Sequence, residues 1–92
     1  MHTIAKQLRI EGRVQGVGFR QFMLHMAHDL GITGWVRNRR DGSVEAIIAG
    51  TPDKVQMMMD RARRGPSHAA VTGFQVAEMS GEWAQFEMRA TE

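Results

Sequence analysis

The sequence predicts a small α+β domain in which two helices cover one face of an antiparallel sheet. Apolar and polar residues alternate in several short segments, as in half-buried strands. In two longer segments apolar residues recur every three or four positions, as in helices. The order of these segments along the chain is the third observation. The 92 residues, of which 42% are hydrophobic, suit one two-layer core, so we expect residues 1–92 to form a single domain.

The first strand is expected over residues 5–14, where apolar residues such as Leu8 and Ile10 alternate with polar ones. The first helix is expected from residue 19 to residue 30, because its apolar residues recur at helical spacing on one face. Gly31 follows directly and suits the end of that helix.

A second strand is expected over residues 32–38. The dipeptide Asp41-Gly42 predicts a hairpin that leads into a third strand over residues 44–48. These two strands are therefore expected to pair antiparallel.

The second helix is expected to begin at Thr51 and Pro52, since threonine suits the N-cap and proline the first helical position. It is expected to end at Gly65. A fourth strand alternates over residues 70–76, and a short closing strand is expected near Phe86.

The expected order is thus β-α-β-β-α-β with a closing strand, which is the split βαβ pattern of a ferredoxin-like sandwich. In its usual strand order, 4-1-3-2, the first and second strands run parallel on either side of the third. Their carboxyl ends then lie at one end of the sheet, with a more polar surface on the face away from the helices. Arg20, just after the first strand, and Asn38, at the end of the second, are expected to converge there.

A glycine-rich stretch, Gly12-Arg13-Val14-Gln15-Gly16-Val17-Gly18-Phe19-Arg20, joins the first strand to the first helix. Glycine lets a ligand approach the backbone closely, and N–H groups at a helix start are unpaired and lie at the positive end of the helix dipole. With the Arg20 guanidinium they would suit a phosphate-sized anion. The stretch matches neither the dinucleotide-binding spacing nor the P-loop. A tight turn without a ligand, with Arg20 as an ordinary surface residue, stays an alternative.

Composition excludes several classes of site. The chain has no cysteine, which excludes disulfides, thiolate catalysis and cysteine-based zinc sites. No apolar run reaches the length of a membrane span and no signal-peptide pattern is present, so we expect a cytoplasmic protein with no membrane partner. His25 and His28 lie on the first helix with only Asp29 nearby, and we interpret them as solvated or partly packed rather than as metal ligands.

Two stretches carry a resemblance to the acylphosphatase family. One is the glycine-rich stretch that ends at Arg20. The other is Gly34-Trp35-Val36-Arg37-Asn38 followed by Asp41-Gly42-Ser43-Val44-Glu45. Their spacing and the order of elements resemble the family over essentially the whole chain, least closely after Phe86. The resemblance implies a ferredoxin-like hydrolase that cleaves the carboxyl-phosphate anhydride of acyl phosphates to a carboxylate and phosphate, without metal or cofactor.

The resemblance also implies roles for residues of this chain. The phosphate-binding arginine of the family falls on Arg20, and its water-positioning asparagine falls on Asn38. The loop amides that hold the substrate phosphate fall on Gln15, Gly16, Val17, Gly18 and Phe19. Such a site would supply charge stabilisation and a placed water, which is what a loose phosphoryl-transfer transition state requires. Because asparagine is not a base, the water proton would have to go elsewhere, for example to the phosphate.

Other functions are open to the same fold. An RNA-recognition module also uses this fold, but stacks bases on aromatic residues of a central strand. A domain that senses phosphate without turnover is a second alternative. A third is the acylphosphatase-like module of larger carbamoyl-transfer proteins of hydrogenase maturation, against which the length of the chain argues. The net charge of +2 favours anionic ligands only slightly, and Arg61, Arg63 and Arg64 are interpreted as stabilising a helix end rather than as a nucleic-acid patch. We expect a monomer with no nucleic-acid partner.

Overall fold

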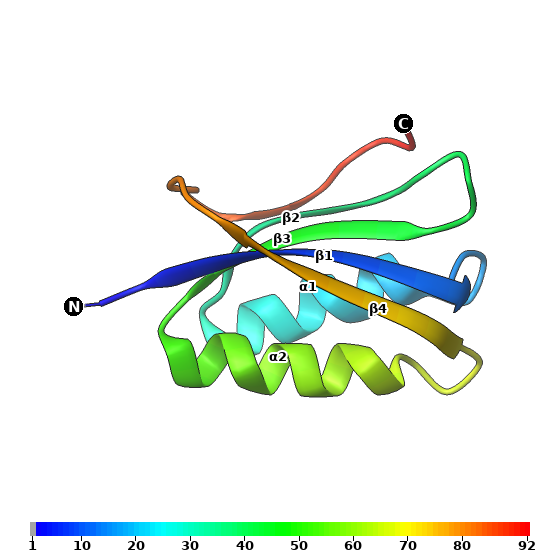
Figure 1. Ribbon diagram of the computed structural model, residues 1–92, viewed down its shortest axis with the longest axis horizontal. Helices are drawn as coiled ribbons and strands as arrows, with labels where there is room; N and C mark the ends of the chain where they lie inside the picture. Colours follow the sequence, from blue (N-terminus) through cyan, green and yellow to red (C-terminus); the bar gives the residue numbers. More distant parts are fainter. Residues whose placement is uncertain (1) are drawn as a thin grey trace.

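The computed structural model describes residues 2–92 and contains two helices and five strands. Figure 1 shows them in two layers, with both helices on one side of the sheet. The elements follow in the order β1 (Ile4–Arg13), α1 (Phe19–Leu30), β2 (Thr33–Asn38), β3 (Val44–Gly50), α2 (Pro52–Arg64), β4 (Ala70–Met79) and β5 (Phe86–Met88). The predicted α+β ferredoxin-like architecture is therefore confirmed.

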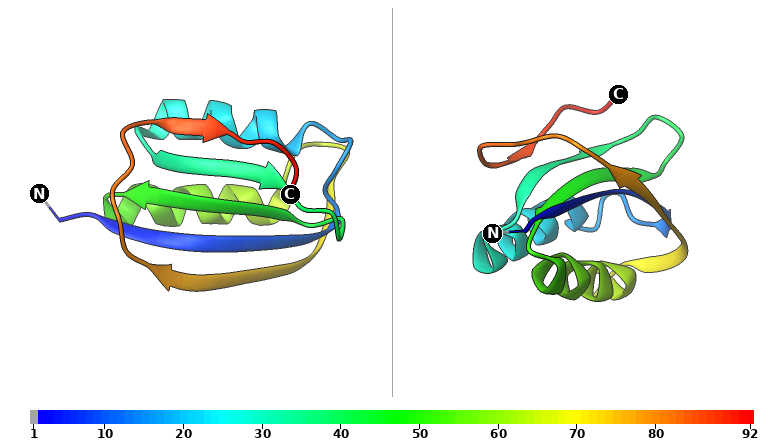
Figure 2. Two further views of the ribbon diagram at one scale, coloured as in Figure 1. Left: turned by 90° about the horizontal axis from the view of Figure 1, so that it is seen from above. Right: turned by 60° about the vertical axis from the view of Figure 1, so that its left-hand side comes forward.

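The sheet has the strand order β4-β1-β3-β2-β5. The four long strands pair antiparallel, in the predicted order, with Ile10 and Asn38 both opposite Val44 of β3. The short β5 differs, because it pairs parallel to β2 and makes the sheet mixed. The reason is the path of the chain after β4, which crosses one end of the sheet and then returns along β2 in the same direction (Figure 2).

The core lies between the sheet and the two helices. Leu8 and Ile10 of β1 are fully buried, as the alternation of the first strand predicts. Met23 of α1 and Met58 of α2 are also fully buried and fill the space between the layers. Burial of each such side chain contributes about 1.5–3 kcal/mol to the free energy of unfolding. The position of α1 relative to β1 is therefore held by apolar packing in the core between the helices and the sheet.

The other face of the sheet is polar. Glu45 of β3 accepts hydrogen bonds from Gln7 at 2.7 Å and from Arg37 at 2.8 Å. Trp35 lies on this face, is 7% exposed, and has the guanidinium groups of Arg37 and Arg89 at 4.7 and 4.9 Å from its ring centre. RNA-recognition modules need an exposed aromatic platform, and here the aromatic ring is covered.

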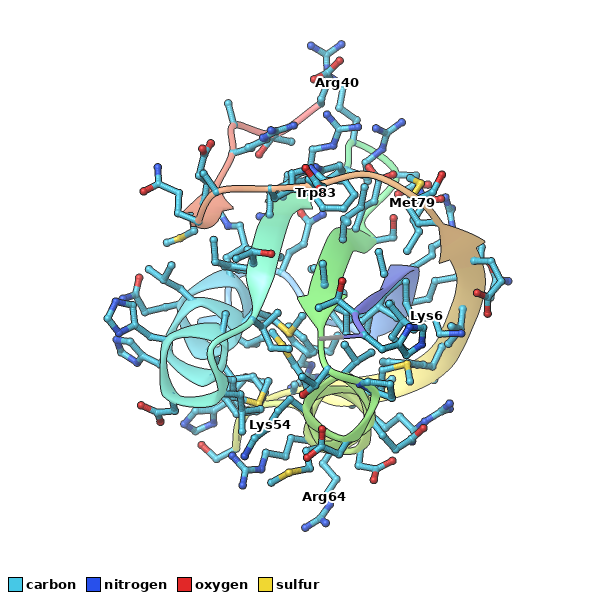
Figure 3. The ribbon with its side chains drawn as sticks, turned by 90° about the vertical axis from the view of Figure 1, so that its left-hand side faces the viewer. Lys6, Arg40, Lys54, Arg64, Met79 and Trp83 are labelled. Carbon is cyan, nitrogen blue, oxygen red and sulfur yellow. The ribbon has the colours of Figure 1, made fainter. Side chains whose placement is uncertain are left out.

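The segment that joins β4 to β5 also lies on the face away from the helices. Figure 3 shows Trp83 of this segment above the sheet, while Arg64 extends from α2 on the opposite side. Within residues 2–92, neither helix has the length and apolar character needed to cross a membrane.

One end of the sheet gathers the segments on which the functional expectations rest. β1 ends there, α1 begins there, and β2 turns there into β3 (Figure 1). This arrangement follows from the strand order, since β1 and β2 run parallel on either side of β3.

Candidate active site

The loop between β1 and α1 takes a conformation that requires glycine. Gly16 and Gly18 have φ values of 71° and 79°, and Gly18 is the N-cap residue of α1 in a left-handed conformation. An added Cβ at either glycine would meet no atom within 4 Å, so backbone conformation and not lack of space favours glycine. The two glycines turn the chain from the end of β1 into the start of α1. The N–H groups of the loop therefore lie next to the first turn of the helix.

The start of α1 carries no negative charge of its own. No side chain caps the helix, and its first turn contains no acidic residue. The orphan N–H groups of that turn and the positive end of the helix dipole are therefore available to an anion. Arg20 lies in this first turn and is half-buried, so a guanidinium adds to the same positive field.

Asn38 is the last residue of β2, and its backbone is held on both sides. It lies opposite Val44 in the sheet, and its carbonyl oxygen accepts a hydrogen bond from the N–H of Glu92 at 3.1 Å. The side-chain Oδ1 of Asn38 is buried and has no hydrogen-bond partner among residues 2–92. An unpaired buried carbonyl oxygen lowers the free energy of unfolding by about 1–3 kcal/mol. A bound molecule that donates a hydrogen bond to this atom would remove that cost.

The structure brings Arg20 and Asn38 to the same pocket, which has a volume of about 180 Å³. Its walls come from the glycine loop, the first turn of α1, the end of β2 and β5. The lining residues are Val14, Gly16, Gly18, Phe19, Arg20, Gln21, Asn38 and Met88. The pocket therefore combines a helix start, a guanidinium and an unpaired amide oxygen.

A larger hollow, of about 610 Å³, lies at the other end of β2 and β3, beside Thr33, Gly50 and Trp83. Glu82 is the only charged residue among those that line it. A negative charge opposes the binding of an anion, so the chemistry favours the smaller pocket as the anion site.

Two residues of the predicted phosphate loop do not line the pocket. Val17 packs against the apolar core. The side chain of Gln15 turns to the β2–β3 turn, where its Nε2 donates to the carbonyl oxygens of Arg39 at 2.7 Å and Ser43 at 2.9 Å. The ring of Phe19 is 2% exposed, so this residue can offer a ligand only its backbone.

Three residues line the pocket that the sequence analysis does not assign to the site: Val14, Gln21 and Met88. Val14 continues the inward alternation of the first strand, and Gln21 directly follows Arg20 in the helix. Both could have been predicted to lie near the site because they are close in sequence to the predicted site residues. Met88 reaches the pocket only because β5 pairs with β2, and no local pattern indicates that pairing.

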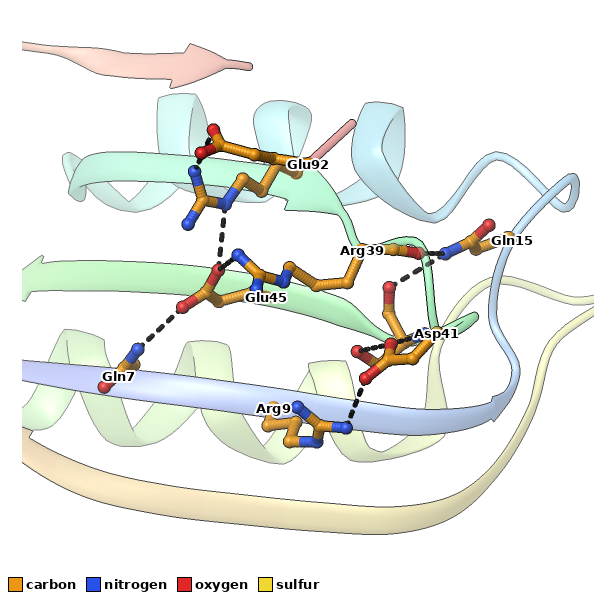
Figure 4. A network of polar contacts seen from close by, with 9 residues as sticks. Gln7, Arg9, Gln15, Arg39, Asp41, Glu45 and Glu92 are labelled. Carbon is orange, nitrogen blue, oxygen red and sulfur yellow. Dashed lines mark hydrogen bonds and ion pairs between the residues drawn. The ribbon is translucent and has the colours of Figure 1, made fainter. Parts of the chain in front are cut away.

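The β2–β3 turn behind the pocket is held by Asp41. Its Oδ1 accepts from the backbone N–H of Ser43 at 2.9 Å and from the Ser43 hydroxyl at 2.7 Å, and its other oxygen pairs with Arg9 (Figure 4). The hydrogen bonds from Ser43, and then the Arg9 charge, lower the pKa of Asp41 to about 2. The turn is thus fixed by an ionised carboxylate at neutral pH.

Glu45 lies at the centre of the neighbouring polar network. Burial alone would raise the pKa of its carboxyl, but hydrogen bonds from Arg37 and Gln7 and the charges of Arg37 and Arg39 together lower it.

Within residues 2–92 no three side chains of His, Cys, Asp or Glu gather as a metal site would need. His25, interpreted above as solvated or partly packed, is exposed and lies within hydrogen-bond distance of Gln21, at 3.2 Å.

Comparisons with known proteins bear on the whole chain and its fold. The family model described as "Acylphosphatase" matches residues 6–88. The chain is 56% identical over 72 residues to an acylphosphatase of Rhodopseudomonas palustris strain BisB18. The aligned residues cover 78% of this chain and 73% of the relative. It is 49% identical over 83 residues to an acylphosphatase of Thiobacillus denitrificans, which covers 90% of this chain and 93% of the relative.

A solved structure points the same way. The acylphosphatase from Coxiella burnetii superposes on this chain with a TM-score of 0.91 and 31% identity, covering 95% of this chain and 93% of that one. Sequence matches across most of the length and a shared fold thus agree, and this chain belongs to the acylphosphatase family of acyl phosphate hydrolases.

Proposed function

We propose that this chain cleaves the carboxyl-phosphate anhydride bond of acyl phosphates in the pocket between α1 and the end of β2, without a metal ion. The phosphate is held by Arg20 and by the N–H groups of the loop from residue 15 to residue 19. Asn38 positions the attacking water. The observation that carries this assignment is the unpaired Asn38 Oδ1 in the same small pocket as Arg20 and the start of α1.

The geometry supports a simple division of labour. Arg20 presents a planar fork that can hold two phosphoryl oxygens, and the loop N–H groups add donors to the same charge. The water donates a hydrogen bond to Asn38 Oδ1, which leaves an oxygen lone pair free to attack phosphorus. The bond from phosphorus to the acyl oxygen breaks, and the carboxylate leaves with the electron pair. Both water protons end on the phosphate, so no side chain has to act as a base.

The experiment that tests this proposal separates catalysis from binding. In Asn38→Ala, we expect turnover of an acyl phosphate to fall by about 10²–10³, while the inhibition constant of inorganic phosphate stays within a few-fold of that of the parent. Assays are run with a chelator present, and parental activity that disappears with chelation and returns with Mg²⁺ or Zn²⁺ would contradict the metal-free step. A domain that only senses phosphate would show no turnover in the parent at all.

Asn38→Asp serves as the matched comparison. It keeps the shape and an acceptor oxygen, but it brings a negative charge toward an anionic substrate, so phosphate inhibition should weaken as well as turnover. If Asn38 only shapes the end of β2, Asn38→Ala would lower the free energy of unfolding by about 0.5–2 kcal/mol and leave the rate per folded molecule close to that of the parent. That result would remove Asn38 from the mechanism.

A further inference from the structure

Gln15 directs its side-chain amide away from the pocket and into the β2–β3 turn. The Nε2 atom donates two hydrogen bonds, to the carbonyl oxygens of Arg39 at 2.7 Å and Ser43 at 2.9 Å (Figure 4). An amide nitrogen carries two protons, so both donors of Gln15 are used on two backbone acceptors. The side chain is half-buried, where such bonds compete less with water.

The two acceptors belong to a well-fixed turn. The N–H of Arg39 donates to the Ser43 carbonyl at 2.8 Å, and the N–H of Gly42 donates to the Arg39 carbonyl at 3.1 Å. Ser43 is 3% exposed, and its backbone N–H and hydroxyl both bind Asp41. Gln15 therefore binds a turn that is itself held by four hydrogen bonds.

The position of these residues in the sequence gives the contact its meaning. Gln15 directly precedes Gly16 of the phosphate loop, and Arg39 directly follows Asn38. β1 and β2 are not neighbours in the sheet, because β3 lies between them. The Gln15 side chain thus links the loop that is proposed to hold phosphate to the turn that follows Asn38, the residue proposed to hold the water.

We propose that Gln15 is a positioning residue that fixes Asn38 relative to the phosphate loop. The inference rests on the proposed function and adds a role for the side chain of Gln15, which touches neither substrate nor water. In an in-line displacement the water and the phosphorus must meet at a set distance and angle. A shift of about 1 Å in the position of one catalytic group can lower the rate by about 10²-fold. The two hydrogen bonds of Gln15 prevent Asn38 from shifting relative to the phosphate loop.

The test uses Gln15→Met, which keeps the length of the side chain and removes both donors. We expect kcat to fall by roughly 10- to 100-fold, with the phosphate inhibition constant within about threefold of that of the parent. The matched control is Gln7→Met in β1, which removes one hydrogen bond to Glu45 outside the pocket. Its kcat should stay close to parental, and rates are expressed per folded molecule so that any loss of stability is removed.

A second variant gives a readout that a purely structural role would not produce. In Gln15→Glu the ionised carboxylate cannot donate and faces two carbonyl oxygens, whereas the protonated carboxyl regains one donor. We therefore expect its kcat, relative to that of the parent, to recover as the pH falls through the pKa of the new carboxyl. This variant also keeps the test decisive if Gln15→Met does not fold.

The outcomes separate the two proposals. A parental kcat in both Gln15 variants, or an equal loss of kcat and phosphate affinity, would overturn the positioning role, the latter by showing that Gln15 acts on the phosphate loop itself. A parental rate in Asn38→Ala would instead overturn the proposed function. A loss of kcat in Gln15→Met that persists unchanged in the Asn38→Ala background would show that Gln15 does not act through Asn38.

Discussion

Arg20 stands at a helix start, where a positive charge is unfavourable for the helix itself. The first turn of α1 has no acidic residue to offset it, and the side chain borders the pocket. A phosphate in the pocket would reverse the sign of this interaction, because the anion would meet both the guanidinium and the helix dipole. The residue is thus better suited to the bound state than to the free helix.

The shape of the cation should matter as well as its charge. We expect Arg20→Lys and Arg20→Ala both to lower kcat/KM by about 10²–10³, since lysine offers a point charge in place of a planar fork. The fold should survive, because Arg20 lies outside the buried face of α1. Arg13→Lys, an exposed arginine at the end of β1, is the control and should leave the rate unchanged. A lysine variant within a few-fold of the parent in steady-state assays would contradict a role for bidentate binding.

At the scale of residues, the sequence predicts those that local chemistry marks. Arg20 and the glycines stand out because they depart from what a helix start or a strand prefers. The Gln15 side chain could not be predicted, because its acceptors are backbone carbonyls and any residue could supply them. Met88 could not be predicted either, because its place in the pocket depends on a strand pairing across the fold.

Among the elements, the β2–β3 turn connects the site to the polar face of the sheet. It follows Asn38 directly, receives Gln15 from the phosphate loop, and is held by Asp41 and Ser43. Asp41 in turn pairs with Arg9 of β1. The turn therefore joins the three strands β1, β2 and β3 at the end where the pocket lies.

This turn should give the protein a stability that depends on pH. The pKa of Asp41 is lowered to about 2 in the folded state, below its usual value of about 3.9. The ionised carboxylate therefore stabilises the fold above about pH 4, and that contribution is lost as the pH falls toward about 2. We expect Asp41→Asn to melt at a lower temperature than the parent at pH 6, with the gap closing between about pH 4 and pH 2. A gap that is constant over this range in thermal melts would show that the charge of Asp41 is not involved.

The elements differ in how far the sequence predicts them. The bounds of α1 and α2 agree with the helical periodicity and with the glycine that follows each. β4 runs on to Met79, beyond the expected end at residue 76, because pairing with β1 continues after the alternation of large apolar residues stops. The parallel pairing of β5 was not expected, since three residues carry too little pattern to indicate a partner or a direction.

At the scale of the whole molecule, positive charge from α2 lies at the same end as the pocket. The end with the pocket carries the last turn of α2, where Arg61, Arg63 and Arg64 gather. Gly65, which ends α2, lies against the ring of Phe19, so the end of α2 packs beside the start of α1. They suit the helix dipole, as expected from the sequence, and they also add a positive field at the end of the molecule where the candidate pocket lies.

That field should raise the rate at which substrate is captured without changing the chemical step. We expect Arg64→Gln to lower kcat/KM by about twofold or less at low ionic strength, the size of effect of one charge acting through water, with kcat unchanged. The difference should disappear as salt approaches about 1 M, where the Debye length falls to about 3 Å. Lys54→Gln is the matched control, because it removes the same charge from the first turn of the same helix, at the far end from the pocket. Steady-state rates over a salt series would contradict steering if the two variants respond alike, or if the Arg64→Gln deficit persists at high salt. In the second case Arg64 would act through local structure at the end of α2, and the field would contribute nothing to capture.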